Sequence, residues 1–458
     1  MGDSSRHSVL FPEVFSKPLH VAFDEPQVTS DGGAVLLKSI DDRLDLTAAM
    51  VGVLEDDRQA SKVVHALEDL FRQRVYGLAC GYADANDVSR MGADPVHKSL
   101  LGRDPLQDAD LASQATLSRF ENGMGRTALY RMGMALMETV LDTHRRRLRR
   151  RKVKRVTIDL DPTDDPTFGQ QEFAFYNGHH RHWCFLPMLC FVTFNDEGDQ
   201  YLVGAVLRPG TAHPKVGSIG ILRRLIEEIR ERFPRARIRV RLDGGFAGPE
   251  MFDFLEEQEV EYLVAMARNS VLERRARKPM AQARRRSKQT GETEREWGET
   301  CYAAQSWKGC QRRVIFKAEV VRLEDRDPRD NCRFVVTNLQ HVPRNVYQIY
   351  RQRGEVENRI KELKEGLYLD RTSCTRFWAN QLRVLMTAAA YVLLQELRRQ
   401  LAKTSLGRAQ VETLRLQLLK IGGRVKSTVR RMVLHLSASH PWRDDWLRVA
   451  RQLGACPL

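Results

Sequence analysis

The spacing of hydrophobic residues changes along the chain, and the two spacings predict a mixed α/β fold. Apolar residues three or four positions apart are typical of amphipathic helices, whereas alternation or short apolar runs are typical of strands. The helical spacing occurs at 34–37, 63–82, 128–148, 217–232, 249–258, 381–401 and 411–421. The strand pattern occurs at 156–161, 183–194, 201–207, 238–242, 260–265, 302–307, 313–321 and 333–337.

The order of these elements predicts five regions. We expect an all-helical N-terminal region at 1–150 and a C-terminal helical region at 401–458. Between them we expect an α/β core in two parts, 151–268 and 341–400. A basic, β-rich insertion at 269–340 separates the two parts, and its first stretch, 269–300, is predicted to be mostly loop.

Composition narrows the possible partners and the cellular setting. The 458 residues carry a net charge of +15, which favours a polyanionic partner such as nucleic acid. The longest apolar helix candidate, 384–394, is too short to span a bilayer and is predicted to be buried core. The eight cysteines form no CxxC pair, and Met1 to His7 is polar, so we expect no signal peptide and a cytoplasmic, nucleoid-associated protein.

Positive charge is densest at 145–155, directly before a predicted strand. Because so many cations repel one another unless they meet anions, the block suggests contact with DNA phosphates. A solvated linker is the alternative explanation. We therefore expect the N-terminal region at 1–150 to bind DNA. The cations that we expect to contact DNA are Arg146, Arg149, Arg150 and Lys152.

Aspartates stand near the ends of two predicted strands. Asp159 and Asp161 share one face of the strand 156–161, and Pro162 ends that strand. Asp243 follows the strand 238–242. Sites in α/β sheets usually lie at the carboxyl ends of strands, although aspartates followed by proline or glycine also occur as simple turn caps.

A third acid belongs to the amphipathic stretch 349–367. On a helix that turns by about 100° per residue, Tyr350, Arg353, Glu357 and Lys364 fall within roughly 60° of one another, beside the apolar stripe. On the same helix Glu355 and Glu362 point to solvent. A salt-bridged helix surface would show the same pattern.

Together, Asp161, Asp243 and Glu357 describe a site for phosphoryl transfer with two metal ions. Carboxylates are the hard oxygen ligands that Mg²⁺ prefers, and we expect Mn²⁺ to substitute. Two ions about 3.5–4 Å apart activate an attacking hydroxyl and stabilise the leaving oxygen. The histidines at 179–182 match no standard zinc spacing and are predicted to lie in a polar loop.

The spacing Tyr350-(2)-Arg353-(3)-Glu357-(6)-Lys364 resembles the Y-R-E-K motif of DDE transposases of the insertion-sequence-4-like superfamily. The stretches 111–122, 161–163, 169–171, 207–210 and 243–246 resemble the branch named after insertion sequence 1380. The resemblance covers about 30–446. It implies an RNase H-like core interrupted by a β insertion, and a homodimer that cuts and pastes DNA at terminal inverted repeats.

The resemblance also assigns roles to single residues. The three acids of the family fall on Asp161, Asp243 and Glu357, with Asp159 as a rival for the first position. Tyr350, Arg353 and Lys364 are expected to contact DNA phosphates around the cleavage site. A tryptophan of the insertion, Trp297 or Trp307, is a weaker candidate for stacking on a flipped base, because tryptophans of a hairpin core are commoner.

The sequence therefore predicts an insertion-sequence transposase that cleaves double-stranded DNA and joins the freed 3′-hydroxyl to target DNA, with a hairpin intermediate as a further expectation. Two alternatives remain open. One is a DNA-end-binding protein without catalysis, and the other is a stand-alone metal-dependent nuclease.

Overall fold

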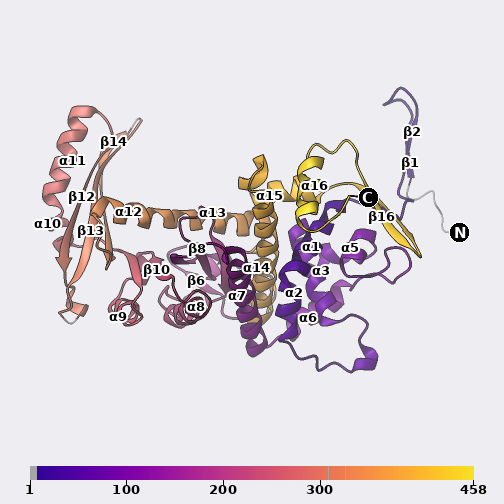
Figure 1. Cartoon of the computed structure of the whole chain (residues 1–458), viewed down its shortest axis with the longest axis horizontal. Helices are drawn as coiled ribbons and strands as arrows, with labels where there is room; N and C mark the ends of the chain where they lie inside the picture. The colour runs from indigo at the N-terminus through magenta and orange to yellow at the C-terminus, as the bar shows by residue number, and fades with distance from the viewer. Residues whose placement is uncertain (1–7, 308, 325, 458) are drawn as a thin grey trace. The chain divides into compact units, whose positions relative to one another are not determined.

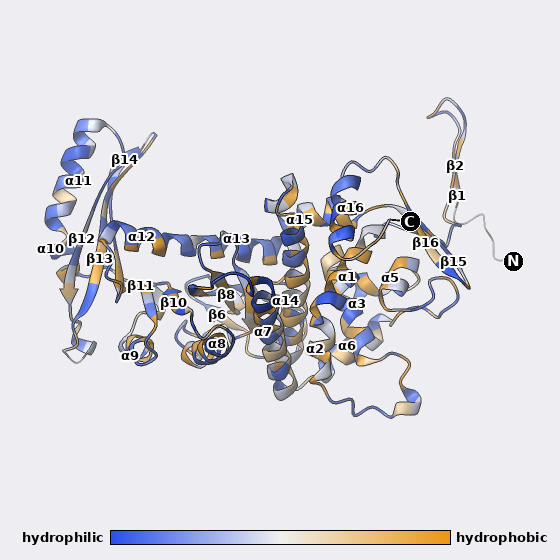
Figure 2. Cartoon of the chain, in the orientation of Figure 1, coloured by the Kyte–Doolittle hydropathy of each residue, from blue (hydrophilic) through white to orange (hydrophobic). Residues whose placement is uncertain are grey.

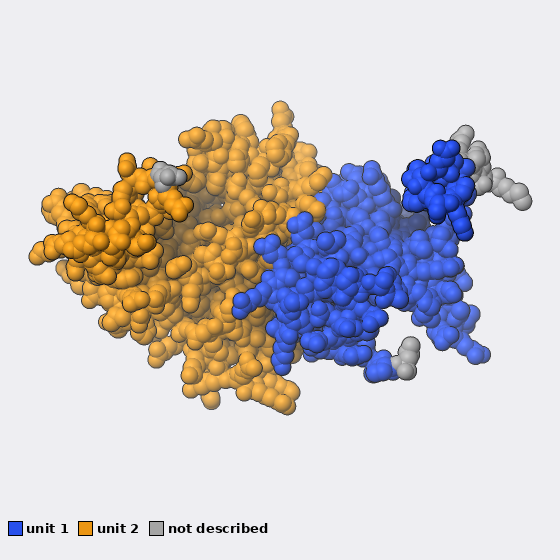
Figure 3. Space-filling view, turned by 90° about the horizontal axis from the view of Figure 1, so that it is seen from above, with its two compact units in different colours: residues 1–43, 56–120, 393–458 blue, residues 44–55, 121–392 orange. Residues whose placement is uncertain are grey.

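The computed structural model describes residues 8–307, 309–324 and 326–457, and the chain forms two compact units (Figure 3). The first unit consists of the described parts of 1–43, 56–120 and 393–458. The second unit consists of 44–55 and the described parts of 121–392. The predicted acids all belong to the second unit.

The helices are distributed over the whole chain (Figure 1). The α-helices are α1 (Val35–Leu44), α2 (Leu46–Gly52), α3 (Leu67–Cys80), α4 (Ala85–Arg90), α5 (Pro95–Leu100), α6 (Gln114–Gly123), α7 (Arg126–Leu148), α8 (Ser218–Arg232), α9 (Pro249–Glu257), α10 (Ser270–Arg275), α11 (Arg277–Thr290), α12 (Pro343–Arg351), α13 (Glu355–Lys361), α14 (Phe377–Gln400), α15 (Val411–Leu414) and α16 (Arg443–Gln452).

The described strands form four sheets. The largest has eight strands in the order β12 (Glu294–Tyr302), β13 (Arg312–Leu323), β14 (Arg326–Thr337), β11 (Glu261–Met266), β10 (Arg237–Leu242), β4 (Arg155–Pro162), β8 (Met188–Phe194) and β9 (Tyr201–Val206). The smaller sheets pair β1 (Ser8–Phe11) with β2 (Leu19–Ala22), β16 (Arg431–Leu436) with β15 (Gly423–Thr428) and β3 (Val28–Thr29), and β5 (Asp165–Pro166) with β7 (His182–Phe185) and β6 (Phe175–Asn177).

Strand direction in the large sheet fixes where the candidate acids meet. β4, β10 and β11 are parallel to one another, whereas β8, β9, β12, β13 and β14 run antiparallel to their neighbours. The register places Arg241 of β10 beside Asp159 of β4. The carboxyl ends of β4 and β10 therefore lie at the same edge of the sheet.

Helices cover both faces of this sheet. Successive residues of a strand face opposite sides, so Tyr262 and Leu263 of β11 mark the two faces. The ring of Phe252, on α9, packs against Tyr262 with centroids 6.0 Å apart. Tyr347, on α12, belongs to the buried cluster around Leu263. The helix series that begins with α12 and carries Glu357 thus lies on the face opposite α9 (Figure 1).

Close backbone approach explains a Gly-Gly pair in the first unit. A Cβ at Gly33 would lie 1.8 Å from the carbonyl oxygen of Leu418, and one at Gly32 would lie 2.9 Å from that of Ile421. No other residue fits there without displacing the segment that contains Leu418 and Ile421. The turn before α1 therefore packs directly on the C-terminal part of the chain.

The apolar segments of the helices bear on two points, the core and membrane crossing. The apolar run 384–394 is buried within α14, as its composition predicted. In the part of the chain that the structure describes, no helix combines the length and the apolarity that crossing a membrane requires.

Four predictions of secondary structure were wrong. One is the strand at 302–307, because β12 ends at Tyr302 and a short 3₁₀ helix spans Gln305–Trp307. The N-terminal region is not all-helical, because Pro12 and Pro18 flank the turn of the hairpin β1–β2. The C-terminal region contains the hairpin β15–β16, in which buried Val425 alternates with exposed neighbours. The stretch 269–300 forms two helices and a strand instead of a loop, because its small buried residues made a weak apolar stripe.

Candidate active site

Two of the predicted acids lie at the carboxyl ends of neighbouring parallel strands. Asp161 is the penultimate residue of β4, directly before Pro162, and it is 8% exposed. Asp243 follows β10 directly and caps the short 3₁₀ helix Gly244–Phe246, where its Oδ1 accepts a hydrogen bond of 2.8 Å from the Gly245 amide. The strand pairing explains why residues far apart in sequence share one edge.

An arginine from the helical segment pairs with Asp161. Arg353 Nη1 donates a hydrogen bond of 3.0 Å to Asp161 Oδ2, and only 13% of the arginine side chain is exposed. Arg353 belongs to a short 3₁₀ turn, Gln352–Gly354, between α12 and α13. The break between the two helices thus occurs where the segment contacts the strand ends.

Electrostatics shows that the three acids share one environment. Burial raises the pKa of Asp161 to about 7, Arg353 opposes that rise, and the negative charges of Asp243 and Glu357 add to it. Burial also raises the pKa of Tyr350, which Arg353 opposes and Asp243 and Asp161 reinforce. The acids that sequence analysis selected are therefore close enough to influence one another.

Asp159, the rival for the first acid, is fully engaged elsewhere. Arg241 donates to its two carboxylate oxygens at 2.8 and 2.6 Å, and Gln200 Nε2 donates to Oδ2 at 3.0 Å. Asp159 is completely buried. Both carboxylate oxygens of Asp159 are therefore occupied, whereas Arg353 donates to one oxygen of Asp161.

The same arginine fastens the helical segment to the sheet. Arg241 Nη1 donates to the carbonyl oxygen of Ile349 at 3.0 Å and to Gln352 Oε1 at 3.3 Å. Ile349 directly precedes Tyr350 in the sequence, and Gln352 directly precedes Arg353. Sequence analysis missed Arg241, although its place on β10, two residues before Asp243, was visible.

Helical phase predicted the exposure of Glu355 correctly and that of Glu362 wrongly. Glu355 and Glu357 are exposed, whereas Glu362 is buried and accepts a hydrogen bond of 2.8 Å from the Tyr391 hydroxyl. The prediction assumed one uniform helix. The segment instead passes through a 3₁₀ turn and a π-helical turn, Glu362–Gly366, and each changes the rotation per residue.

Lys364 contacts an aspartate that sequence analysis did not select. Its Nζ lies 2.7 Å from Asp164 Oδ1, and His182 Nε2 lies 3.2 Å from Asp164 Oδ2. Burial raises the pKa of Asp164, but the hydrogen bond and charge of Lys364 outweigh it and hold that pKa below its ordinary value. The turn after β4 therefore holds Lys364, because Asp164 lies only three positions after Asp161 in the sequence.

The basic block lies at the other end of β4 from Asp161. Arg155 begins the strand, so at about 3.3 Å per residue the two ends are roughly 20 Å apart. Arg147 and Arg155 pair with Glu197 and Asp196. The exposed side chains of the block include Arg146, Arg149, Arg150 and Lys152. The structure thus does not bring the block and the acids together.

The structure contradicts a stacking role for Trp307. It is 4% exposed, and its ring centroid lies 5.2 Å from Phe252 and 5.3 Å from Tyr302. Trp297 is partly buried, with the Arg344 guanidinium 5.3 Å from its ring centroid. Packing in the hairpin core therefore accounts for Trp307.

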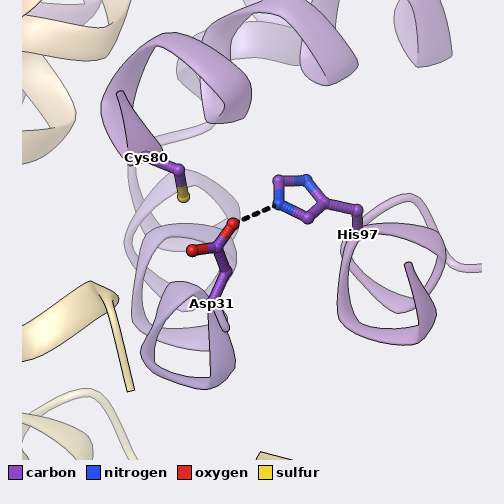
Figure 4. Close-up of side chains that lie close together, drawn as sticks. All are labelled: Asp31, Cys80 and His97. Atoms are coloured by element: carbon purple, nitrogen blue, oxygen red, sulfur yellow. Dashed lines mark hydrogen bonds and ion pairs between the residues drawn. The ribbon is translucent and has the colours of Figure 1, made fainter. Parts of the chain in front are cut away.

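A different cluster has the closest spacing of potential metal ligands. Among the described residues, the only group of three or more His, Cys, Asp or Glu side chains whose ligand atoms lie within 4.8 Å of one another is Asp31, Cys80 and His97, in the first unit (Figure 4). Asp161, Asp243 and Glu357 are thus more widely spaced than that.

Charge argues that the Asp31 cluster is a structural network. His97 Nε2 lies 2.9 Å from Asp31 Oδ2, and the Tyr82 hydroxyl donates to the same oxygen at 2.8 Å. Lys420 Nζ lies 2.7 Å from Asp31 Oδ1, so an ammonium already neutralises the carboxylate. Burial raises the pKa of the Cys80 thiol and disfavours the thiolate that a metal would require.

Comparison with known proteins identifies the family. No curated protein matches the chain. The family model described as transposase DDE domain group 1 matches residues 11–457, nearly the whole chain. The chain therefore belongs to the transposase DDE domain group 1 family.

Proposed function

We propose that this transposase cleaves DNA at terminal inverted repeats and transfers the freed 3′ ends into target DNA, in a cut-and-paste reaction. The observation that carries the proposal is that Asp161 pairs with Arg353 and that the charges of Asp243 and Glu357 add to the rise in the pKa of Asp161 that burial causes. Two parallel strands and one helix, far apart in sequence, supply these side chains.

The strand order supports an RNase H-like core within this proposal. β9, β8, β4, β10 and β11 are consecutive in the sheet, with β4, β10 and β11 parallel and β8 and β9 antiparallel. The strands β12 to β14 extend the same sheet from the edge of β11. The core at 151–268 and 341–400, with an insertion at 269–340, is part of the proposal.

The three acids fit divalent cations by their chemistry. They supply carboxylate oxygens, the ligands that Mg²⁺ prefers and that Mn²⁺ accepts. Burial raises the pKa of Asp161 and the charges of Asp243 and Glu357 add to that rise, whereas a bound cation would favour the ionised carboxylates. When bound to Asp161, Asp243 and Glu357, such ions supply an activated hydroxyl nucleophile and stabilise the leaving 3′ oxygen.

The neighbouring residues bind and orient the DNA strand. Arg353 is half-buried beside Asp161, and its guanidinium offers planar donors that suit a phosphate. Tyr350 is close enough to Arg353, Asp243 and Asp161 for their charges to act on it, and its hydroxyl can donate to a phosphate. Asp164 holds the Lys364 ammonium in place, so its remaining donors can bind a second phosphate.

The distant basic block suits a separate stretch of the same DNA. Because it begins roughly 20 Å from Asp161 along β4, it contacts phosphates several base pairs from the cleavage site. We include a homodimer on paired ends in the proposal, since both ends of one element must be cut together. A hairpin intermediate is a further part of the proposal.

The test uses the full-length protein with duplex DNA that contains the element's ends. We expect cleavage at the inverted repeat with Mg²⁺ or Mn²⁺, none with chelator, and sequenced products joined to a second duplex. Cleavage without joining would identify a stand-alone nuclease. Metal-independent binding without cleavage would identify a DNA-end-binding protein, and either result would overturn the proposal.

A further inference from the structure

Helix α11 of the insertion is strongly basic and carries no acid. Between Arg277 and Thr290 the chain has six cations and neither aspartate nor glutamate. The six are Arg277, Lys278, Arg284, Arg285, Arg286 and Lys288. Such a helix has no internal ion pairs to offset its charge, so the surroundings must supply the anions.

Helical phase separates the buried side chains from the cations. The buried positions Leu272, Ala276, Met280, Ala283 and Ser287 fall within about 80° of one another at about 100° per residue. Five exposed cations lie within about 100° of one another on the opposite side. These five, which we call the basic row, are Arg274 of α10 and Arg277, Lys278, Arg285 and Lys288 of α11.

The protein neutralises the other cations of α11 but leaves the basic row. Arg284 Nε donates to Asp330 at 2.9 Å, and Arg286 Nη1 donates to Glu296 at 2.7 Å. Across residues 8–307, 309–324 and 326–457, no ion pair or hydrogen bond engages a side chain of the basic row. The charge of this surface is therefore available to a partner.

The basic row faces away from the candidate active site. Ala318 and Val320 of β13 pack against Met280 and Ala283 of α11, whereas Ile315 packs with α12. Even-numbered and odd-numbered residues of a strand point to opposite faces, so α11 and α12 cover opposite faces of the insertion strands. Figures 1 and 2 show α11 as a hydrophilic helix beyond these strands.

We propose that the basic row binds the phosphate backbone of a duplex DNA segment other than the one held at Asp161, Asp243 and Glu357. Charge complementarity selects the occupant, because the row consists of long cationic side chains spread over about 20 Å of helix. That length matches about six base pairs. The inference rests on the proposed function, which supplies DNA as substrate, and it adds a second DNA-binding surface.

Contacts to phosphates carry no sequence information, so the surface should bind element ends and unrelated duplexes alike. This property suits target DNA or the flanking part of an element end. An acidic protein is the competing partner. It would be favoured if loss of the basic row left the salt dependence of DNA binding unchanged.

The experiment measures how DNA affinity depends on salt, without divalent metal, so that cleavage plays no part. Full-length protein is titrated with a fluorescent random-sequence duplex between about 50 and 200 mM salt, the range over which phosphate contacts dominate affinity. The variant carries Arg277→Gln, Lys278→Gln, Arg285→Gln and Lys288→Gln. All four side chains are exposed, and equal thermal unfolding midpoints confirm that the variant is folded.

We expect the slope of log affinity against log salt to fall by about 3 to 4, since each phosphate contact contributes about 0.9. Two matched double variants refine the test. Arg285→Gln with Lys288→Gln should lower the slope by about 2, whereas the charge-keeping Arg285→Lys with Lys288→Arg should preserve it.

An unchanged slope in the quadruple variant would overturn the inference, as would an equal loss of slope in the charge-keeping variant. A loss confined to element-end DNA would also contradict it, because phosphate contacts do not read sequence. The proposed function stands or falls separately, on metal-dependent cleavage and joining.

Discussion

Arg353 Nη1 lies 3.0 Å from Asp161 Oδ2, in a position where 13% of the arginine side chain and 11% of the aspartate side chain are exposed. This ion pair joins the helical segment to the end of β4. We infer that it holds the site together before DNA and metal arrive, and that the same guanidinium then faces a phosphate.

Replacing Arg353 therefore impairs cleavage more than folding. We expect Arg353→Ala to slow single-turnover cleavage of an end-containing duplex by about 10²-fold, as loss of a preorganised donor typically does. Arg353→Lys should recover only part of the rate, because an ammonium lacks the planar fork. The control is Arg351→Ala, an exposed cation two residues away. Equal rates for the two alanine variants would contradict this role.

The Asp159–Arg241 pair governs stability. Arg241→Met leaves the Asp159 carboxylate buried without its cation, which should destabilise the fold by about 3–5 kcal/mol. Adding Asp159→Asn removes the orphaned charge and should recover most of that loss. Chemical denaturation of the single and double variants measures the difference. Additive losses would show that the two residues do not act as a pair.

Adjacent aspartates should respond to pH in opposite directions. Burial raises the pKa of Asp165 to about 8, although Thr372 donates a hydrogen bond of 2.8 Å to it. The folded state therefore binds the proton more tightly than the unfolded state, whose aspartate pKa is about 3.9. The stability that protonated Asp165 contributes is complete below about pH 4 and is lost as the pH rises toward 8.

Asp165→Asn should consequently match the wild type near pH 4 and exceed it above pH 8, by about 1–3 kcal/mol. Asp164→Asn is the matched control, because Lys364 lowers the pKa of Asp164. Its contribution is present above the unfolded pKa and lost as the pH falls through the folded pKa, so this variant should be destabilised at neutral pH only. Unfolding midpoints at several pH values test both signs.

The Asp31 cluster should hold no zinc. We expect elemental analysis of the purified protein to find no stoichiometric zinc. We also expect Lys420→Met to lower the free energy of unfolding by about 1–3 kcal/mol, because it leaves the buried Asp31 carboxylate without its cation. One zinc per chain, lost in Cys80→Ala, would show that the cluster is a metal site.

Sequence patterns predicted the parts of this fold in which each element repeats one period. The alternation of β4 and the turn signals after β10 placed Asp161 and Asp243 at strand ends, where the structure has them. The pattern at 384–394 predicted a buried helix, and α14 contains it.

Other features depend on pairings between distant residues, which a local pattern does not encode. The sequence around Asp159 does not predict its ion pair with Arg241, because the register between β4 and β10 brings the two residues together. Glu362 is buried because the helix changes its pitch through a π-helical turn, whereas the prediction used one constant rotation per residue. The small residues that bury α11 gave a signal too weak to distinguish from loop.

The comparison of two neighbouring glutamates tests the central claim most directly. Glu357 and Glu355 lie on the same helix and are both exposed, and the charge of Glu357 adds to the rise in the pKa of Asp161 that burial causes. Cleavage of end-containing duplex with Mg²⁺ is measured for Glu357→Gln and Glu355→Gln. We predict that Glu357→Gln abolishes cleavage while retaining DNA binding, and that Glu355→Gln cleaves like the wild type. Full cleavage by Glu357→Gln would contradict the assignment of the three acids.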